Sequence, residues 1–126
     1  MSGTKFLLDI NIIIGIVKGN DESLTVLQDR SVEIDMCAYS FISRIELLGY
    51  PGITDVEIEY IQTILGAMQY LPIAQLVEDM AIQIRRQYKL KIPDAIIAAT
   101  AKVSDLELIT LDQQLANRMV DILNID

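Results

Sequence analysis

The hydrophobic pattern of this chain opens with an uninterrupted apolar run from Phe6 to Leu8. Such a run is typical of a strand that is buried on both faces, as the strands of a parallel sheet are. Asp9 follows where this strand should end, and Asn11 begins a second apolar run that continues to Val17. In open α/β sheets, ligands bind in the crevice outside the carboxyl ends of the strands. Asp9 is therefore either the cap of the next helix or part of a binding site.

Helical and strand signals alternate along the rest of the chain. Ser40 and Thr54 stand where helix N-caps are expected, and Glu57 completes a capping box with Thr54. Pro72 assigns its strand to a sheet edge, because proline donates no backbone hydrogen bond. Helices are expected at about residues 11–17, 21–29, 41–48, 54–65, 74–88, 93–103 and 112–119, and strands at 6–8, 32–39, 70–73, 106–110 and 120–125. This alternation predicts a parallel sheet covered by helices on both faces.

Composition restricts the class of protein further. The chain has 126 residues, of which 52% are hydrophobic, and we expect one ordered domain spanning residues 1–126. No apolar run reaches the ~18 residues needed to cross a bilayer, and no signal peptide is visible, so we expect a soluble cytoplasmic protein without membrane association. Cys37 is the one cysteine and is expected to fill space in the core. Because the chain contains no histidine, zinc sites and Ser–His or Cys–His catalysis are excluded.

The net charge of −8 is unusual for a protein that binds nucleic acid. It arises from 18 acidic and 10 basic residues. If four of the acids were metal ligands, divalent ions would offset them, leaving 14 acids against 10 bases, or −4. The acidity therefore argues against a nucleic-acid partner without excluding one.

Four acids stand in settings that differ from an ordinary solvated surface: Asp9, Glu46, Asp94 and Asp112. Glu46 falls on the same helical face as Ile42 and Ile45, where an apolar residue is expected. Asp94 heads the apolar face of its helix, and Asp112 follows a predicted strand. Helix capping is the alternative explanation for the three aspartates.

Carboxylates gathered at the carboxyl edge of one sheet would repel one another and raise one another's pKa values. Such clusters typically bind hard divalent cations such as Mg²⁺ or Mn²⁺, which take oxygen ligands. One or two of these ions can activate water and stabilise a phosphodiester during cleavage. The repulsion also predicts that neutralising Asp9 leaves the metal-free protein equally or more stable.

In chain order, four segments resemble the motifs of PIN domains, most closely those of small VapC-type toxin ribonucleases: Leu7-Leu8-Asp9-Ile10-Asn11, Ser43-Arg44-Ile45-Glu46-Leu47, Pro93-Asp94-Ala95-Ile96-Ile97-Ala98-Ala99-Thr100-Ala101 and Leu108-Ile109-Thr110-Leu111-Asp112. The resemblance spans nearly the whole chain, and its third block is the most specific. It implies a single-domain α/β/α sandwich with a central parallel sheet, and an endoribonuclease that depends on Mg²⁺ or Mn²⁺. It also implies catalytic and metal-binding roles for the four acids, supported by Asn11 and Thr110. Ile10 departs from the family pattern, in which Thr or Ser commonly stands at this position.

The resemblance further implies an RNA substrate, an antitoxin protein whose tail blocks the site, and a homodimer. An excess of apolar residues on helices 54–65 and 74–88 would suit isologous dimer contacts. The densest basic segment leads directly into Asp94, so it is a candidate RNA contact, although cations also suit a helix C-terminus. Its cationic residues are Arg85, Arg86, Lys89 and Lys91.

Two other functions remain open at the level of sequence. A catalytically silent PIN-like module would bind RNA or protein without cutting, but such modules usually lose acids, and this chain keeps all four. An Asp-based phosphatase or a phospho-accepting receiver shares the doubly wound fold. The phosphatase requires a second Asp two residues after the first, where this chain has Asn11. The receiver requires paired acids and a lysine that we do not find in place.

Overall fold

A parallel sheet forms the centre of the computed structural model, which describes residues 3–125. Its strands are β1 (Phe6–Leu8), β2 (Cys37–Ser40), β3 (Gln69–Leu71) and β4 (Glu107–Ile109), in the spatial order β3-β2-β1-β4. Leu7 and Leu8 of β1 are fully buried in hydrophobic clusters on opposite faces of the sheet. A strand buried on both faces is what the opening apolar run predicts, so the predicted parallel sheet is confirmed.

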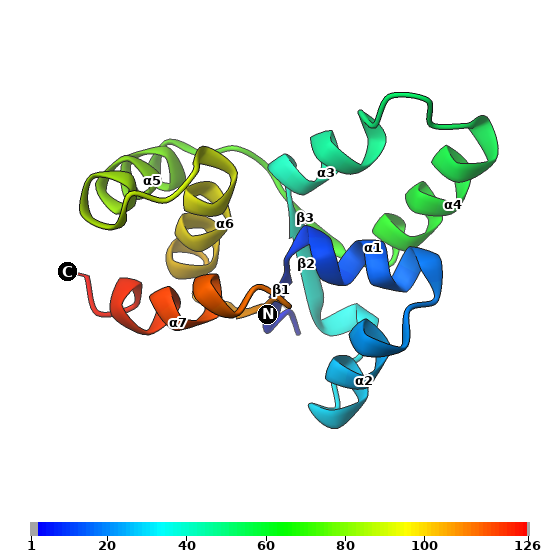
Figure 1. The fold of residues 1–126 in the computed structure, drawn as a ribbon, viewed down its shortest axis with the longest axis horizontal. Coiled ribbons are helices and arrows are strands. Elements are labelled where there is room, and N and C mark those ends of the chain that lie inside the picture. The colour runs from blue at the N-terminus through cyan, green and yellow to red at the C-terminus, as the bar shows by residue number, and fades with distance from the viewer. Residues whose placement is uncertain (1–2, 126) are drawn as a thin grey trace.

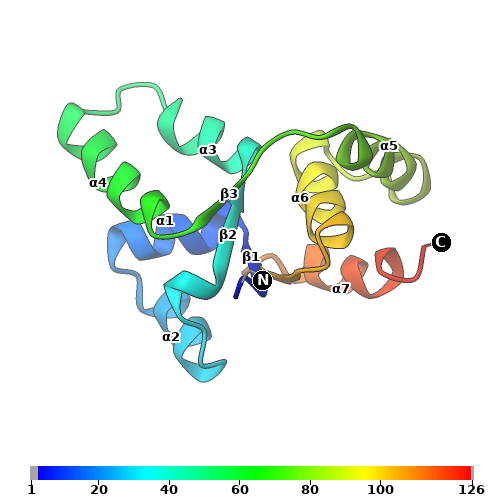
Figure 2. The ribbon, with the colours of Figure 1, turned by 180° about the vertical axis from the view of Figure 1, so that it is seen from behind.

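Helices cover both faces of this sheet (Figures 1 and 2). One layer consists of α1 (Ile10–Lys18), α2 (Asp21–Asp29), α3 (Phe41–Leu48) and α4 (Asp55–Gly66). The other consists of α5 (Gln75–Tyr88), α6 (Ile92–Val103) and α7 (Gln113–Ile122). The expected three-layer α/β/α sandwich is therefore confirmed. Within residues 3–125, no helix combines the length and apolar character needed to cross a membrane.

Local hydrogen bonds specify several helix ends. The Ser40 side chain accepts a hydrogen bond from the Ser43 N–H at the start of α3, and Thr54 forms a capping box with Glu57 at the start of α4. Gly19 ends α1 with a left-handed φ of 68°, which glycine adopts without a Cβ clash. These boundaries agree with the predicted ones because the signals that set them lie within a few residues of each helix end.

The C-terminal segment is helical where the sequence pattern predicted a strand. α7 continues to Ile122, and no strand is present over residues 120–125. Leu115, Met119 and Ile122 are buried at helical spacing, and this packing overrides the apolar alternation that begins at Val120. The predicted strand at 120–125 is wrong.

The second strand is shorter than the predicted span of residues 32–39. Ile34–Met36 form a 3₁₀ turn, and β2 begins only at Cys37. Glu33 and Asp35 are exposed in this approach to the sheet. Carboxylates there would be costly to bury in an interior strand, so the chain enters the sheet only after them.

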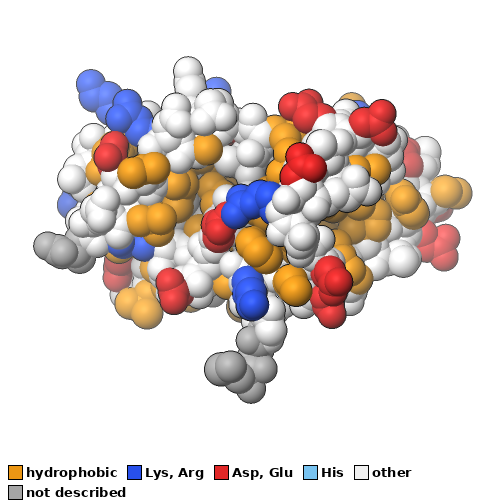
Figure 3. Space-filling view, turned by 90° about the horizontal axis from the view of Figure 1, so that it is seen from below, with side chains coloured by type: hydrophobic (Ala, Val, Ile, Leu, Met, Phe, Trp, Pro, Cys, Tyr) orange, Lys and Arg blue, Asp and Glu red, His pale blue; other side chains and the backbone are white. Residues whose placement is uncertain are grey.

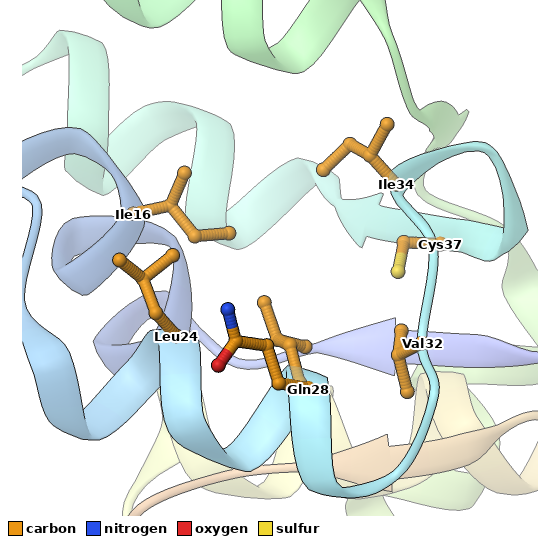
Figure 4. A pocket seen from close by; sticks show the side chains of 7 residues that line it. Ile16, Leu24, Gln28, Val32, Ile34 and Cys37 are labelled. Atoms are coloured by element: carbon orange, nitrogen blue, oxygen red, sulfur yellow. The ribbon is translucent and has the colours of Figure 1, made fainter.

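A cavity of about 270 Å³ lies between α1, α2 and the segment that enters β2 (Figure 4). The side chains labelled around it in Figure 4 are Ile16, Leu24, Gln28, Val32, Ile34 and Cys37. The Cys37 thiol donates a hydrogen bond to the Glu33 carbonyl at 3.4 Å, and burial raises the pKa of this thiol to about 11. A thiol that stays protonated is a poor nucleophile, so Cys37 serves packing, as the sequence predicts.

The two helices proposed for dimer contacts do not form one surface. α4 packs against the same face of the sheet as α1, whereas α5 packs against the other face with α6 (Figures 1 and 2). Each helix exposes its own apolar side chains, such as Val56 on α4 and Leu76 on α5. A symmetric contact would therefore use one of these helices rather than a continuous patch spanning both.

Candidate functional site

The carboxyl ends of β1 and β4 meet at one edge of the sheet. Leu8 aligns with Ile109, and the ladder continues one step further because the Asp9 N–H donates to the Ile109 carbonyl at 3.0 Å. Asp9 and Thr110 therefore leave the sheet side by side. Glu46 lies on α3 and Asp94 on α6, one in each helical layer, and Asp112 follows Thr110 at the start of α7.

Asp9 is held by hydrogen bonds to both of its carboxylate oxygens. Its Oδ1 accepts from the Ile10 N–H at 2.8 Å, as an N-cap of α1 does. Its Oδ2 accepts from the Thr110 hydroxyl at 2.7 Å and from the Asn11 amide at 3.3 Å. The side chain is only 5% exposed. Asp9 is thus a helix cap, but only one of its oxygens serves the cap.

Asn11 and Thr110 form a polar network that joins the two strand ends. The Asn11 amide nitrogen donates to the Thr110 hydroxyl at 3.2 Å, and the Asn11 carbonyl accepts from the Leu111 N–H at 3.0 Å. The Thr110 hydroxyl also accepts from the Asp112 N–H at 3.0 Å. Each polar group therefore has a partner, which fixes the loop after β4 relative to Asp9. The hydroxyl bonded to Asp9 comes from Thr110, whereas Ile10 offers none.

Glu46 lies outside the buried face of α3. Ser43 and Leu47 are the buried residues of this helix, and Ile45 is 61% exposed. The prediction that Glu46 shares a buried apolar face is therefore wrong. The side chain borders a groove beside Ile10, and partial burial there followed by the charges of nearby acids raises the pKa of Glu46.

Asp94 is a half-buried acid in the first turn of α6. α6 begins at Ile92, and its N-cap is Lys91, so Asp94 is not the cap. Burial raises the pKa of Asp94, and the charges of Asp9 and Asp112 raise it further. Asp9 and Asp94 also act on Glu46. The negative charges of Asp9 and Asp94 therefore reach Glu46 across the sheet edge.

Asp112 is a helix N-cap, as the alternative explanation for the aspartates predicted. Its Oδ1 accepts from the Gln114 and Leu115 N–H groups at 3.0 and 3.1 Å, which caps α7. The residue is exposed, and it contributes to the raised pKa of Asp94. The structure thus places Asp112 near Asp94 while giving it a structural role as the cap of α7.

The donor set suits a magnesium or manganese ion bound by few protein ligands. Within residues 3–125, no three acidic or cysteine side chains lie close enough to hold one metal ion together. Mg²⁺ commonly takes only one or two carboxylates and completes its shell with water and substrate oxygens. The described structure shows no hydrogen bond to the carboxylates of Glu46 and Asp94. These two groups are therefore free to bind a cation without losing an internal partner.

Both candidate RNA-binding lysines, Lys89 and Lys91, lie beside this edge. Burial, Asp9 and Asp112 raise the pKa of Asp94, whereas the positive charge of Lys91 lowers it. The Lys91 ammonium group therefore lies near the Asp94 carboxylate. Lys89 lines a pocket that also reaches Asp94 and Asp112.

The two candidate arginines differ from each other. The Arg85 Nε donates to the Leu90 carbonyl at 3.2 Å and so ties the end of α5 to the turn before α6. Arg86 is exposed near the end of α5. Arg85 therefore has a structural contact that Arg86 lacks in the described chain.

Arg118 is a basic residue near the site that no sequence motif indicated. Its guanidinium carbon lies 5.8 Å from the ring centroid of Tyr88, and both residues line the pocket that reaches Asp112. The spacing of Gln114, Arg118 and Asp121 puts these residues on one face of α7. This polar face on a helix capped by Asp112 is the signal that could have identified Arg118.

Basic side chains do not gather on the face of the molecule seen in Figure 3. There, Lys and Arg are separated by apolar and acidic side chains. This agrees with the net charge of −8.

The fold and the order of these residues agree with a known family. The family model of the PIN domain matches residues 6–119. The chain therefore belongs to the PIN domain family, and the family expected from the sequence is confirmed. This assignment removes the alternative of an Asp-based phosphatase or receiver.

Solved structures show the same similarity. One is a toxin–antitoxin complex from Klebsiella pneumoniae, with 30% identity, a TM-score of 0.76 and coverage of 87% of this chain and 88% of that chain. FitAcB from Neisseria gonorrhoeae has 26% identity, a TM-score of 0.75 and coverage of 91% and 93%. VapBC2 from Rickettsia felis, bound to a DNA fragment from the promoter, has 15% identity, a TM-score of 0.73 and coverage of 90% and 92%, and shows the fold alone. No relative was found among curated proteins.

Proposed function

We propose that this chain is a metal-dependent endoribonuclease and the toxin of a toxin–antitoxin pair. The observation that carries the proposal is the pair of carboxylates on Glu46 and Asp94. Both have raised pKa values, and neither has an internal hydrogen bond in the described structure. Carboxylates whose pKa values are raised by burial and then by neighbouring acids are typical of functional sites, and a bound cation would offset their charges.

Glu46 and Asp94 would hold a Mg²⁺ or Mn²⁺ ion, with Asp9 and Asp112 beside them. When bound, the ion would supply an activated water and charge stabilisation for the phosphodiester being cut. The Thr110 hydroxyl and the Asn11 amide hold the Oδ2 of Asp9 in place. Asp9 would contribute its charge to the metal site through this oxygen. Lys91 would place a positive charge near the substrate phosphate.

RNA is the substrate that family membership and the local charge support. The net charge of −8 opposes binding of a polyanion in general. Metal binding would offset the acids at the site, and the cations at the α5–α6 turn lie beside them. The metal would therefore strengthen RNA binding as well as supply the chemistry, while the nearby cations attract RNA even in its absence. We expect the protein to act in the cytoplasm, where RNA is found.

An antitoxin would cover the site from the layer that contains α1. An apolar groove of about 270 Å³ between α1, α3 and α4 is lined by Ile10, Ile14 and Tyr50, with Glu46 at its border. A partner segment lying in this groove would bury exposed apolar surface and reach the acids. The similar toxin–antitoxin complex from Klebsiella pneumoniae supports a partner of this kind. A homodimer would use exposed apolar residues elsewhere, such as Val56 and Tyr60 on α4.

Incubation of the purified chain with single-stranded RNA tests this function. We expect cleavage with Mg²⁺ or Mn²⁺, none with EDTA, and loss of cleavage in Asp94→Asn while the variant stays folded. Asp79→Asn is the matched control, because Asp79 is an exposed acid on α5 away from the site. If the parent binds RNA but never cuts it, the chain is a silent binding module. If Asp94→Asn cuts as fast as Asp79→Asn, Asp94 has no catalytic role.

A further inference from the structure

A second pocket opens from the candidate site on the side of α5, α6 and α7. Its volume is about 530 Å³, and it is lined by residues of all three helix regions. Sites for small molecules typically occupy roughly 300–1,000 Å³, so a group the size of a nucleotide can enter. Asp94 and Asp112 form the end next to the candidate metal site, and Lys89 and Arg118 also line it. The pocket is thus continuous with the site and carries both acidic and basic groups.

The guanidinium group of Arg118 is oriented by the ring of Tyr88. The distance of 5.8 Å from the guanidinium carbon to the ring centroid lies within the range of a cation–π contact. Such packing limits the rotation of a long side chain and leaves the N–H groups at the guanidinium edge free for an acceptor. Within residues 3–125, the structure contains one salt bridge, between Arg30 and Glu107. The Arg118 guanidinium is therefore not neutralised by an ion pair.

Lys89 is placed by the backbone of the turn between α5 and α6. It has a left-handed φ of 55°, a conformation that a lysine adopts only at some energetic cost. The Arg85 Nε bond to the Leu90 carbonyl holds the same turn in place. Two cations on different elements are therefore held at one pocket by separate contacts.

We infer that this pocket binds one nucleotide of the RNA strand next to the phosphodiester that is cut, with Arg118 and Lys89 binding its phosphate. This inference rests on the proposed ribonuclease function and assigns a substrate subsite to it. Adjacent phosphates of one strand would then contact the metal site at one end of the pocket and the two cations at the other. Asp121 also lines the pocket; its carboxylate repels phosphate but accepts hydrogen bonds from groups such as a ribose 2′-hydroxyl. A nucleotide offers both kinds of group, whereas a free phosphate offers only one.

The test compares Arg118→Gln with Arg30→Gln. Both substitutions remove one exposed cation. Arg30 is the control because it pairs with Glu107 at the start of β4, whereas the candidate site lies at the other end of that strand. Binding of a mixed-sequence single-stranded RNA is measured in EDTA over a range of salt concentrations, and cleavage is measured with Mn²⁺. We expect Arg118→Gln to bind about tenfold more weakly, as loss of one charge-assisted contact implies, with a matching rise in KM. The slope of log affinity against log salt should fall by about 0.7, the value for one lost phosphate contact on a single strand.

Two further variants make the result specific. Arg118→Lys keeps the charge but not the planar group, so it should keep the salt slope while losing affinity. Lys89→Asn removes the second cation with a residue that tolerates a left-handed φ, and should also reduce the slope. Thermal melting confirms that each variant is folded.

The outcomes separate this inference from the proposed function. If the parent cuts RNA but Arg118→Gln and Lys89→Asn bind it as Arg30→Gln does, the pocket is not a subsite and the ribonuclease function stands. An equal loss in all three variants indicates general electrostatic attraction and also overturns the subsite. If the parent neither binds nor cuts RNA under any metal condition, the function itself is refuted, and the subsite with it.

Discussion

Asp9 and Asp94 should respond in opposite ways to the loss of their negative charge, because only Asp9 has internal hydrogen-bond partners. Asp94 has none in the described structure, and burial and nearby acids raise its pKa. Asp94→Asn therefore removes repulsion and breaks no internal bond. From the sequence alone, the same gain is expected for Asp9→Asn. The bonds to Thr110 and Asn11 reverse that expectation, because they require an acceptor.

The expected magnitudes follow from these contacts. In EDTA, Asp94→Asn should melt at or above the temperature of the parent. Asp9→Asn turns an NH₂ group toward a donor, or leaves one unpaired, which costs about 1–3 kcal/mol. For a chain of 126 residues, 1 kcal/mol changes the melting temperature by about 4 °C. Asp9→Asn should therefore melt about 4–12 °C below the parent.

Metal binding adds the discriminating measurement. Mn²⁺ at about ten times its Kd stabilises a one-site protein by about 1.4 kcal/mol, or about 6 °C here. The parent should show this gain, and Asp94→Asn should lose most of it. Thr110→Val is the control, because it breaks the hydrogen bond to Asp9 without changing charge. It should melt lower in EDTA and keep the gain from Mn²⁺.

Melting curves of the four proteins, with EDTA and across a Mn²⁺ titration, decide the matter. Asp94 is not a metal-binding residue if Asp94→Asn melts several degrees below the parent in EDTA and still gains as much from Mn²⁺. In that case the Asp94 carboxylate would have a structural role, and the ion would bind elsewhere.

The pH dependence of stability and the salt dependence of RNA binding test the same site. The pKa values of Glu46 and Asp94 are raised above their ordinary values of 4.5 and 3.8, so the stability that these groups contribute is complete below those values and is lost as the pH rises through the raised ones. Lowering the pH from neutrality should therefore relieve their repulsion and shrink the gain from Mn²⁺; a gain that is undiminished at pH 4.5 would contradict this assignment. Arg86→Ala should weaken RNA binding and reduce its salt slope by about 0.7, and Arg85→Ala should in addition lower the melting temperature because its bond to Leu90 is lost. Slopes equal to that of the parent in both variants would remove these arginines from the RNA-binding surface.

Element boundaries were predictable where short-range signals set them and not where tertiary packing did. Ser40 and Thr54 specify the starts of α3 and α4 through bonds to residues three positions away. The segment after Met119 has no comparable signal, and its apolar residues fit both a strand and a helix. Contact of Ile122 with the cluster beneath α5 and α6 decides in favour of the helix. Sequence periodicity cannot reveal that contact.

The site was predictable in its residue types but not in its bonding. Asp9 and Thr110 are 101 positions apart, and only the pairing of β1 with β4 brings them into contact. The distinction between Asp9, which is fully bonded, and Asp94, which is not, depends on that pairing. Arg118 escaped notice for a related reason, because its proximity to Tyr88 arises from the packing of α7 near the end of α5.

The two proposed approaches to the site lie in different helical layers. The apolar groove beside Glu46 is formed by α1, α3 and α4, whereas the pocket with Arg118 is formed by the region of α5, α6 and α7. The acids stand between the groove and the pocket, since Glu46 borders the former and Asp94 the latter. A partner segment in the groove would reach the carboxylates proposed to bind metal without occupying the proposed nucleotide pocket. Inhibition would then act by blocking the ion and the scissile phosphate, while the cations that hold the rest of the RNA strand stay accessible.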